Sequence, residues 1–171
     1  MTRWWSALLG RFAILREVAG RGDALLFARS FGFALVLPLL LRLSLPRLKA
    51  LLEPGAAPGV VEPDARERIV ASVQAMLRAG APLIRPGCLT RGVTLYYFLR
   101  RAGVDVALCF GMGRGHDTAD GFDGHCWLVL AGEPYLEPRD PRPLYTEMYS
   151  FSARSGSQPG EGSLTPSRQP R

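Results

Sequence analysis

The hydrophobic positions at the start of the chain indicate helices. Between residues 4 and 19, apolar side chains recur close to helical spacing, at Trp4, Leu8, Phe12 and Leu15. A second apolar stretch, residues 31–41, contains Pro38 and is too short to cross a bilayer, which requires about 20 apolar residues. We therefore expect residues 1–52 to form a helical arm that packs on a domain or touches a partner or a membrane surface.

The pattern changes after the arm. Residues 53–63 are rich in proline and glycine, which predicts a linker. Helical spacing returns at Asp64, where Glu67 completes a candidate capping box, and Gly80 ends this helix. Another helix is predicted from Cys88 to about Arg101.

The remaining apolar residues follow the spacing of β-strands. Strands are predicted over 104–113 and 125–131, on either side of the polar, glycine-rich loop 114–124. The chain then turns at Gly132, returns through Tyr135 and Leu136, and reaches a last short element at 144–151. Residues 152–171 are mostly Ser, Gly, Pro and Arg and are expected to be a disordered tail. Residues 64–151 thus have the helices and strands of an α+β domain.

The charge is unevenly distributed along the 171 residues. The chain has 21 Lys and Arg against 15 Asp and Glu, a net charge of +6. Residues 1–52 carry +6, residues 53–151 carry −2, and residues 152–171 carry +2. A nucleic-acid-binding domain usually has its basic residues on the folded body, so we do not expect nucleic-acid binding. We interpret the basic arm as a docking surface for a partner protein, ahead of the alternatives of a substrate or a membrane.

The cysteine content favours the cytoplasm. Three cysteines form neither an even disulfide set nor a CxxC pair, and arginines interrupt the opening residues where a signal peptide would need an apolar run. In a reducing compartment, a single reactive thiol is a reasonable expectation.

Cys88 is the candidate nucleophile. It follows Gly87 at the start of a predicted helix, where free backbone N–H groups and the helix dipole stabilise a thiolate. The same N–H groups could stabilise an oxyanion on an attacked carbonyl. The alternative is a buried structural cysteine at a helix start.

His125 is the candidate base. It opens a predicted strand after a glycine-rich loop, and Trp127 lies two residues later, where it could shield the ring. A thiolate–imidazole pair also needs a group that orients the ring, and Glu137 and Asp140 both follow the returning strand. The alternative for a single histidine is a structural role. His116, in the polar loop, is expected to be exposed.

A metal site is the competing use of these residue types. Candidate ligands are present, but no short paired-ligand spacing joins Cys88, His116, His125 and Cys126. His125 and Cys126 are adjacent on a strand and should point to opposite faces. Cys109 and Cys126 lie in apolar strands and are expected to be small core residues. We therefore expect no metal and no other cofactor.

Several short motifs resemble a known family. The segment RPGCLTRGVTLYYFLRRAGVDVALCFGMGR, followed by GHCWLVLAGEPYLE, resembles the transglutaminase-like leader peptidases of lasso-peptide biosynthesis. The motifs that carry the resemblance are Cys88, Leu89 and Arg91; Leu99, Arg100, Arg101 and Gly103; Gly111; and His125 with Trp127. The match covers about residues 64–138, and residues 31–52 resemble the family's helical N-terminal portion more weakly.

This resemblance implies a papain-like core with the nucleophile at a helix N-terminus, packed on a small antiparallel sheet. It implies a cysteine peptidase that removes the leader from a ribosomally made precursor, with Cys88, His125 and an acid as catalytic residues and Arg91 and Trp127 as substrate-binding residues. The implied partners are the precursor, a small leader-recognition protein and an asparagine-synthetase-like macrolactam cyclase.

The sequence departs from the family pattern at two places. Gly92 stands where Ser is usual, and Glu137 stands where the family normally has Asp, with Asp140 three residues further on. The third catalytic residue is therefore either Glu137 or Asp140. Two other functions remain open: a non-catalytic peptide-binding module of the same fold, and an acyltransferase or amidase that uses the same residues.

Overall fold

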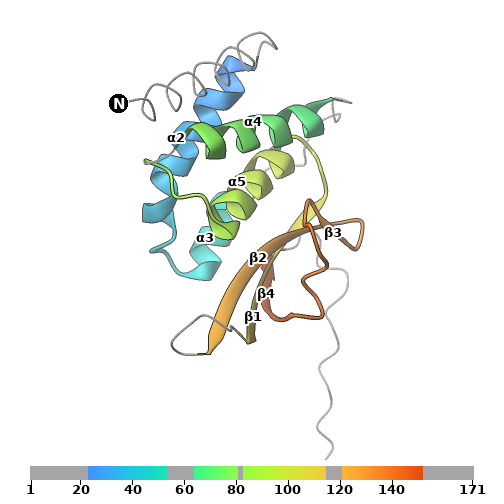
Figure 1. Ribbon diagram of the computed structural model, residues 1–171. Coiled ribbons are helices and arrows are strands. Elements are labelled where there is room, and N and C mark those ends of the chain that lie inside the picture. The colour runs from blue at the N-terminus through green and yellow to red at the C-terminus, as the bar shows by residue number, and fades with distance from the viewer. Residues whose placement is uncertain (1–22, 54–63, 81–82, 115–120, 152–171) are drawn as a thin grey trace, which may run out of the picture.

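Among the residues that the structure describes, four helices lie on one side of a four-stranded sheet, and the last of these helices packs directly on it (Figure 1). The computed structural model describes residues 23–53, 64–80, 83–114 and 121–151. The helices are α2 (Ala24–Leu40), α3 (Leu45–Leu52), α4 (Ala65–Ala79) and α5 (Cys88–Arg101). The strands are β1 (Val106–Arg114), β2 (Phe122–Leu130), β3 (Glu133–Tyr135) and β4 (Tyr145–Phe151). The predicted α+β fold with a small antiparallel sheet is confirmed. Some predictions fall outside the described residues: the helix at 4–19, residues 54–63 of the linker, the exposure of His116, and the tail at 152–171.

The strand order determines where the chain crosses the sheet. The order is β3-β2-β1-β4, and every neighbouring pair is antiparallel. Because β3 and β4 lie at opposite edges, residues 136–144 must pass across β2 and β1 to connect them. The helix α5 packs on one face of these strands, so this connection runs over the other face, where Pro141 is buried.

The helical arm contributes to the same hydrophobic core as the sheet. Leu37 of α2 and Leu48 and Leu52 of α3 are fully buried in one cluster with α4, α5 and the strands. Burying a leucine side chain stabilises a fold by about 1.5–3 kcal/mol, so these contacts hold α2 and α3 firmly. Along the described residues, no helix is long and apolar enough to span a membrane.

A glycine lets α5 approach the sheet closely. A Cβ atom at Gly92 would lie 2.8 Å from the Sγ atom of Cys126 and 3.2 Å from the Cδ1 atom of Leu108. Such distances are shorter than ordinary van der Waals contact, so a larger residue would push the helix away from β1 and β2. The departure from the family pattern at Gly92 thus coincides with tight helix–sheet packing.

Two local predictions are wrong. Asp64 precedes α4, but its backbone is helical (φ −92°, ψ −3°) and its side chain makes no capping hydrogen bond, so the expected capping box with Glu67 does not form. A capping side chain reaches the free N–H groups from an extended backbone, which Asp64 lacks. In addition, β2 begins at Phe122, so His125 lies within the strand, opposite Gly111, rather than at its start.

Candidate functional site

Cys88 is the first residue of α5. Gly87 before it is extended (φ −172°, ψ 165°), and its carbonyl accepts the N–H of Arg91 to close the first helical turn. The N–H groups of a first turn have no partner within the helix and point toward the region in front of the thiol. Cys88 is partly buried. This placement agrees with the position expected for a nucleophile at a helix N-terminus.

The side chains of His125 and Glu137 form a close pair. The Nε2 atom of His125 lies 2.9 Å from the Oε2 atom of Glu137, whose side chain is only 8% exposed. Because an ionised carboxylate only accepts hydrogen bonds, Nε2 carries the proton, which leaves Nδ1 able to accept another. The contact with Glu137 therefore fixes the orientation of the imidazole.

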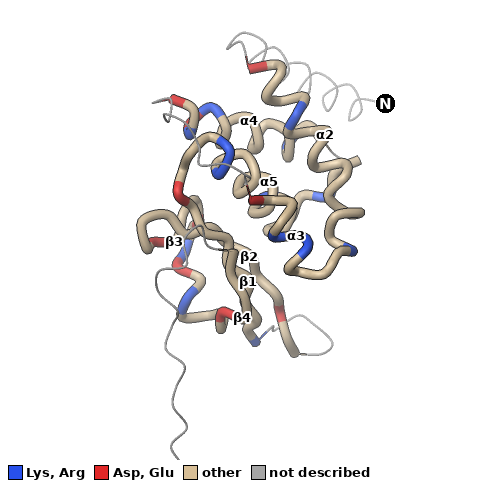
Figure 2. Tube along the Cα trace, turned by 180° about the vertical axis from the view of Figure 1, so that it is seen from behind, with Lys and Arg blue, Asp and Glu red and all other residues tan. Residues whose placement is uncertain are grey.

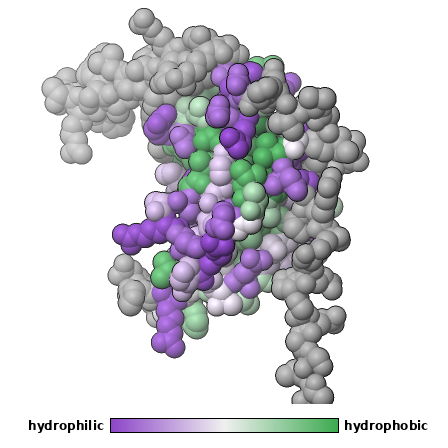
Figure 3. Space-filling view, turned by 90° about the vertical axis from the view of Figure 1, so that its right-hand side faces the viewer, coloured by the Kyte–Doolittle hydropathy of each residue, from purple (hydrophilic) through white to green (hydrophobic). Residues whose placement is uncertain are grey.

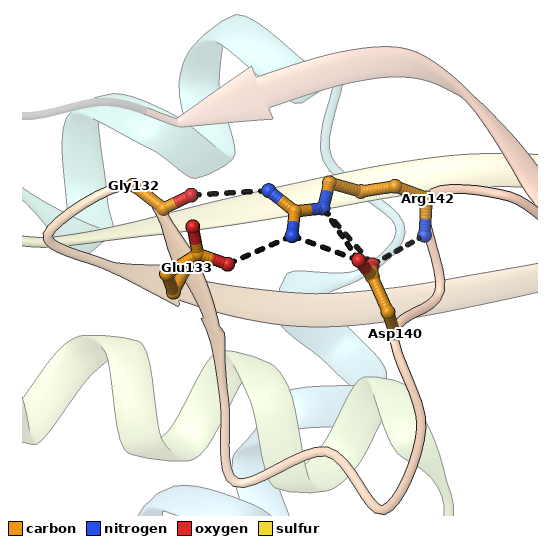
Figure 4. A network of polar contacts seen from close by, with 4 residues as sticks. All are labelled: Gly132, Glu133, Asp140 and Arg142. Carbon is orange, nitrogen blue, oxygen red and sulfur yellow. Dashed lines mark hydrogen bonds and ion pairs between the residues drawn. The ribbon is translucent and has the colours of Figure 1, made fainter.

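Asp140 lies elsewhere. Its carboxylate accepts hydrogen bonds from the Nε, Nη2 and backbone N–H groups of Arg142 at 2.8–2.9 Å, and Arg142 also binds Glu133 and the carbonyl of Gly132 (Figure 4). These hydrogen bonds hold the pKa of Asp140 below its ordinary value. The sequence left two acids open as partners of His125, and the structure brings Glu137 to it. Asp140 instead binds Arg142, which connects residues 136–144 to the turn between β2 and β3.

Arg91 connects α5, the helix that begins at Cys88, to Glu137. Its Nη1 atom lies 3.4 Å from Oε1 of Glu137, and its Nη2 group donates to the carbonyl of Leu136. Leu136 has a left-handed backbone (φ 61°), an unfavourable conformation for a leucine that this hydrogen bond helps to hold. The sequence predicted Arg91 as a substrate-binding residue, but the structure places its guanidinium on Glu137.

The site residues gather beyond the end of β3. This strand pairs only with Leu128–Leu130 of β2, and a small cavity next to these residues is lined by Cys88, Arg91, Gly92, Leu95, Cys126, Trp127, Leu128, Tyr135 and Glu137. Cys88 and Glu137 thus share one cavity, and Glu137 binds His125. Within the described part of the chain, no hydrogen bond joins Cys88 directly to His125.

Trp127 lies behind the candidate base. It is 2% exposed, and its ring lies 6.0 Å from that of His125 at an angle of 13°. A Cβ atom at Gly111 would lie 2.8 Å from two carbons of the Trp127 ring, so this glycine makes room for the indole. This packing places Trp127 beside the imidazole, and Trp127 also lines the small cavity. Its contact with a substrate stays a prediction.

The other two cysteines lie in the core. Cys109 and Cys126 are buried, and burial raises the pKa of Cys109 to about 12 and raises that of Cys126 further. Both thiols therefore stay protonated near neutral pH. Among the residues that the structure describes, no three His, Cys, Asp or Glu side chains are grouped so that they could hold a metal ion.

Comparison with known proteins decides the family. A model of the transglutaminase-like superfamily matches residues 33–150. The chain belongs to this superfamily. The superfamily includes cysteine peptidases and transferases, which are enzymes that use a cysteine as the nucleophile. Searches of curated proteins and of solved structures find no match.

A groove lies beside the site of this transglutaminase-like domain. It has a volume of about 360 Å³ and lies between α4 and the end of β3, where it is lined by Arg66, Glu67, Val70, Ala71, Gln74, Tyr135 and Leu136. Figure 3 looks at this side of the molecule and shows hydrophobic atoms between hydrophilic ones. Tyr135 borders both the groove and the cavity that contains Cys88.

Tyr145 and Asp123 were not predicted as residues of the site. Tyr145 lies at the start of β4, and its ring is 5.0 Å from that of His125. Its hydroxyl donates a 3.0 Å hydrogen bond to Asp123, which falls within the loop predicted at 114–124. The sequence does contain one signal for this contact, the pair of glycines at 111 and 113. Glycines at alternate positions of a central strand leave space for large side chains on neighbouring strands.

Proposed function

We propose that this protein is a cysteine peptidase that removes the leader peptide from a lasso-peptide precursor. Cys88 is the nucleophile, His125 the base and Glu137 the residue that orients the base. The observation that carries the proposal is the His125–Glu137 pair beside the cavity that contains a helix-start cysteine. Membership of the superfamily supports the reaction type, and the motifs around Cys88 and His125 support the leader as substrate.

The proposed reaction has two stages. In the first, Nδ1 of His125 takes the proton of Cys88, the thiolate attacks the scissile carbonyl, and the proton passes to the departing amine of the core peptide. The product is a thioester between Cys88 and the leader. In the second, His125 takes a proton from water, the resulting hydroxide attacks the thioester, and the leader acid leaves as the thiol regains its proton. Glu137 keeps the imidazole oriented and stabilises its positive charge at both stages.

The surroundings of the site suit a peptide. The N–H group of Cys88 is one donor for the oxyanion, because the first turn of α5 leaves it without a helical acceptor. A peptide bound at Cys88 can extend past Tyr135 into the apolar groove beside α4. Released core peptide has a free amine, which an asparagine-synthetase-like cyclase could join to a side-chain carboxylate.

A small leader-recognition protein is the proposed partner of the helical arm. The segment from Ala24 to Leu52 contains Arg29, Arg42, Arg47 and Lys49 and no acidic residue, as the blue positions along α2 and α3 show in Figure 2. Leu25 and Leu39 are more than 60% exposed on the same arm. An apolar surface with one sign of charge is complementary to an acidic partner surface.

The test is cleavage of the cognate precursor by the full chain together with the leader-recognition protein, followed by mass spectrometry. Wild type should release leader with a free carboxylate, Cys88→Ala should release none, and Cys109→Ala should cleave as wild type does. Undiminished cleavage by Cys88→Ala would refute the assignment. Transfer of the leader to an added amine instead of water would identify an acyltransferase.

Alkylation of the thiol distinguishes a peptidase from a non-catalytic binding module. The peptidase predicts that iodoacetamide modifies Cys88 near pH 6 much faster than it modifies a free cysteine. A rate equal to that of free cysteine would favour the binding module.

A further inference from the structure

We propose that Tyr145 is a positioning residue that fixes the plane of the His125 imidazole. This inference rests on the proposed role of His125 as the base. Tyr145 comes from β4, at the edge of the sheet opposite β3, and reaches His125 across the central strand β1. Its contribution is therefore independent of the contact that Glu137 makes from the other edge.

The ring contacts form a three-membered aromatic cluster. The ring of Tyr145 lies 5.0 Å from that of His125 at 29°, and that of Trp127 lies 6.0 Å from it at 13°. Tyr145 and Trp127 are themselves 6.4 Å apart. Glu137 holds the imidazole at one nitrogen, and a single hydrogen bond allows the ring to tilt. Stacked rings oppose this tilt, because they fill the space into which the imidazole would move.

The strand register explains how Tyr145 reaches so far. Gly113 of β1 is paired with Asp123 of β2 on one side and with Tyr145 of β4 on the other. Neighbouring strands are about 4.8 Å apart, so Asp123 and Tyr145 are separated by about two strand spacings. Gly113 has no side chain to stand between them, and the Tyr145 hydroxyl donates to Oδ2 of Asp123 at 3.0 Å.

Gly113 is required for this arrangement. A Cβ atom there would lie 2.4 Å from the carbonyl oxygen of Leu144 and 2.9 Å from the Cδ1 atom of Tyr145. The carbonyl belongs to the backbone and cannot rotate away. Any larger residue at 113 would therefore displace the start of β4 together with the ring on His125.

The hydroxyl of Tyr145 acts as an anchor rather than as an acid. Its hydrogen bond to Asp123 raises its pKa above the ordinary value. Tyr145 thus remains a neutral donor to Asp123 through the neutral pH range. This anchor places the ring beside the imidazole of His125.

The first test compares variants of Tyr145 in precursor cleavage. Tyr145→Leu removes the ring, and we expect kcat to fall about 10- to 100-fold with KM within twofold, as small misplacements of a catalytic group cause. Tyr145→Phe keeps the ring but loses the anchor, so its kcat should lie between those of wild type and Tyr145→Leu. Tyr149→Leu is the matched control, since Tyr149 packs on Phe151 from the same strand and does not stack on His125.

The second test does not require the substrate. In a His116→Gln background, the only imidazole signals in the proton NMR spectrum come from His125. Tyr145→Leu should shift them, because the ring current of the tyrosine is lost, while Tyr149→Leu should leave them nearly unchanged. Iodoacetamide modification of Cys88 should also slow in Tyr145→Leu.

The outcomes separate the two proposals. Full kcat in Tyr145→Leu, or unshifted His125 signals, would overturn the positioning role while the peptidase remains. If wild type does not cleave the precursor but Tyr145→Leu shifts the His125 signals and slows Cys88 alkylation, the positioning role holds and the leader-peptidase proposal fails.

Discussion

Replacing Glu137 by Gln tests the central contact of the site. The substitution keeps the size of the side chain and removes its charge. His125 then loses the carboxylate at 2.9 Å, and Arg91 loses its ion pair at 3.4 Å. The amide of Gln can also present an N–H group to the imidazole, which favours the wrong tautomer.

The size of the effect follows from the positive charge that His125 acquires during the reaction. At an effective dielectric constant of about 20, two unit charges about 4 Å apart attract by about 4 kcal/mol. The side chain of Glu137 is 8% exposed and that of His125 is 22% exposed, so water screens this pair only partly. Since each 1.36 kcal/mol changes a rate tenfold, losing about 3–4 kcal/mol lowers kcat by about 10²- to 10³-fold.

The assay is cleavage of the precursor at saturating concentration, with Asp140→Asn as the matched control. Asp140 is an exposed carboxylate bound to Arg142, so its replacement should change kcat less than about twofold. Circular dichroism should show that both variants fold. If Asp140→Asn lost activity while Glu137→Gln kept it, the assignment of the third residue would be reversed.

Two further predictions concern packing and partner binding. Gly92→Ala should lower the free energy of unfolding by about 1–2 kcal/mol in urea titrations, because its Cβ would lie 2.8 Å from Sγ of Cys126. In a Cys126→Ala background, the same change should leave the free energy of unfolding unchanged or raise it by up to about 1 kcal/mol, because Ala favours a helix over Gly by about that amount. Equal losses of stability in both backgrounds would contradict the clash. Arg29→Glu combined with Arg47→Glu should weaken binding of the leader-recognition protein at least tenfold by calorimetry. Arg78→Glu on α4 should not, and equal affinities of all three proteins would exclude the arm as the docking surface.

The elements that carry the proposed nucleophile and the proposed base could be predicted because their signals are local. The helix from Cys88 to Arg101 was predicted with the observed bounds, since its apolar spacing and Gly103 lie within one segment. The opposite orientations of His125 and Cys126 follow from strand geometry alone, and the register confirms them. The choice of Glu137 over Asp140 could not be made from the sequence, because it depends on where Arg142 places Asp140.

The contacts between distant strands were not predictable in the same way. Asp123 and Tyr145 are 22 residues apart, and they meet only because both are paired with Gly113. A shift of register by one residue would turn either side chain to the other face of the sheet. The contact of Arg91 with Glu137 was not predicted for a similar reason, since Glu137 follows a strand and lies 46 positions away in sequence.

The short length of β3 is the feature on which the site depends. Cys126 faces α5 through Gly92, so its neighbour His125 belongs to the opposite face of β2. A nucleophile on α5 and a base on that face can meet only around an edge of the strand. Because β3 stops pairing at Leu128 and the left-handed Leu136 turns the chain, Glu137 reaches His125 at this edge. Arg91 ties Glu137 to α5. A longer β3 would continue the ladder toward His125 and would occupy the edge that Glu137 now uses.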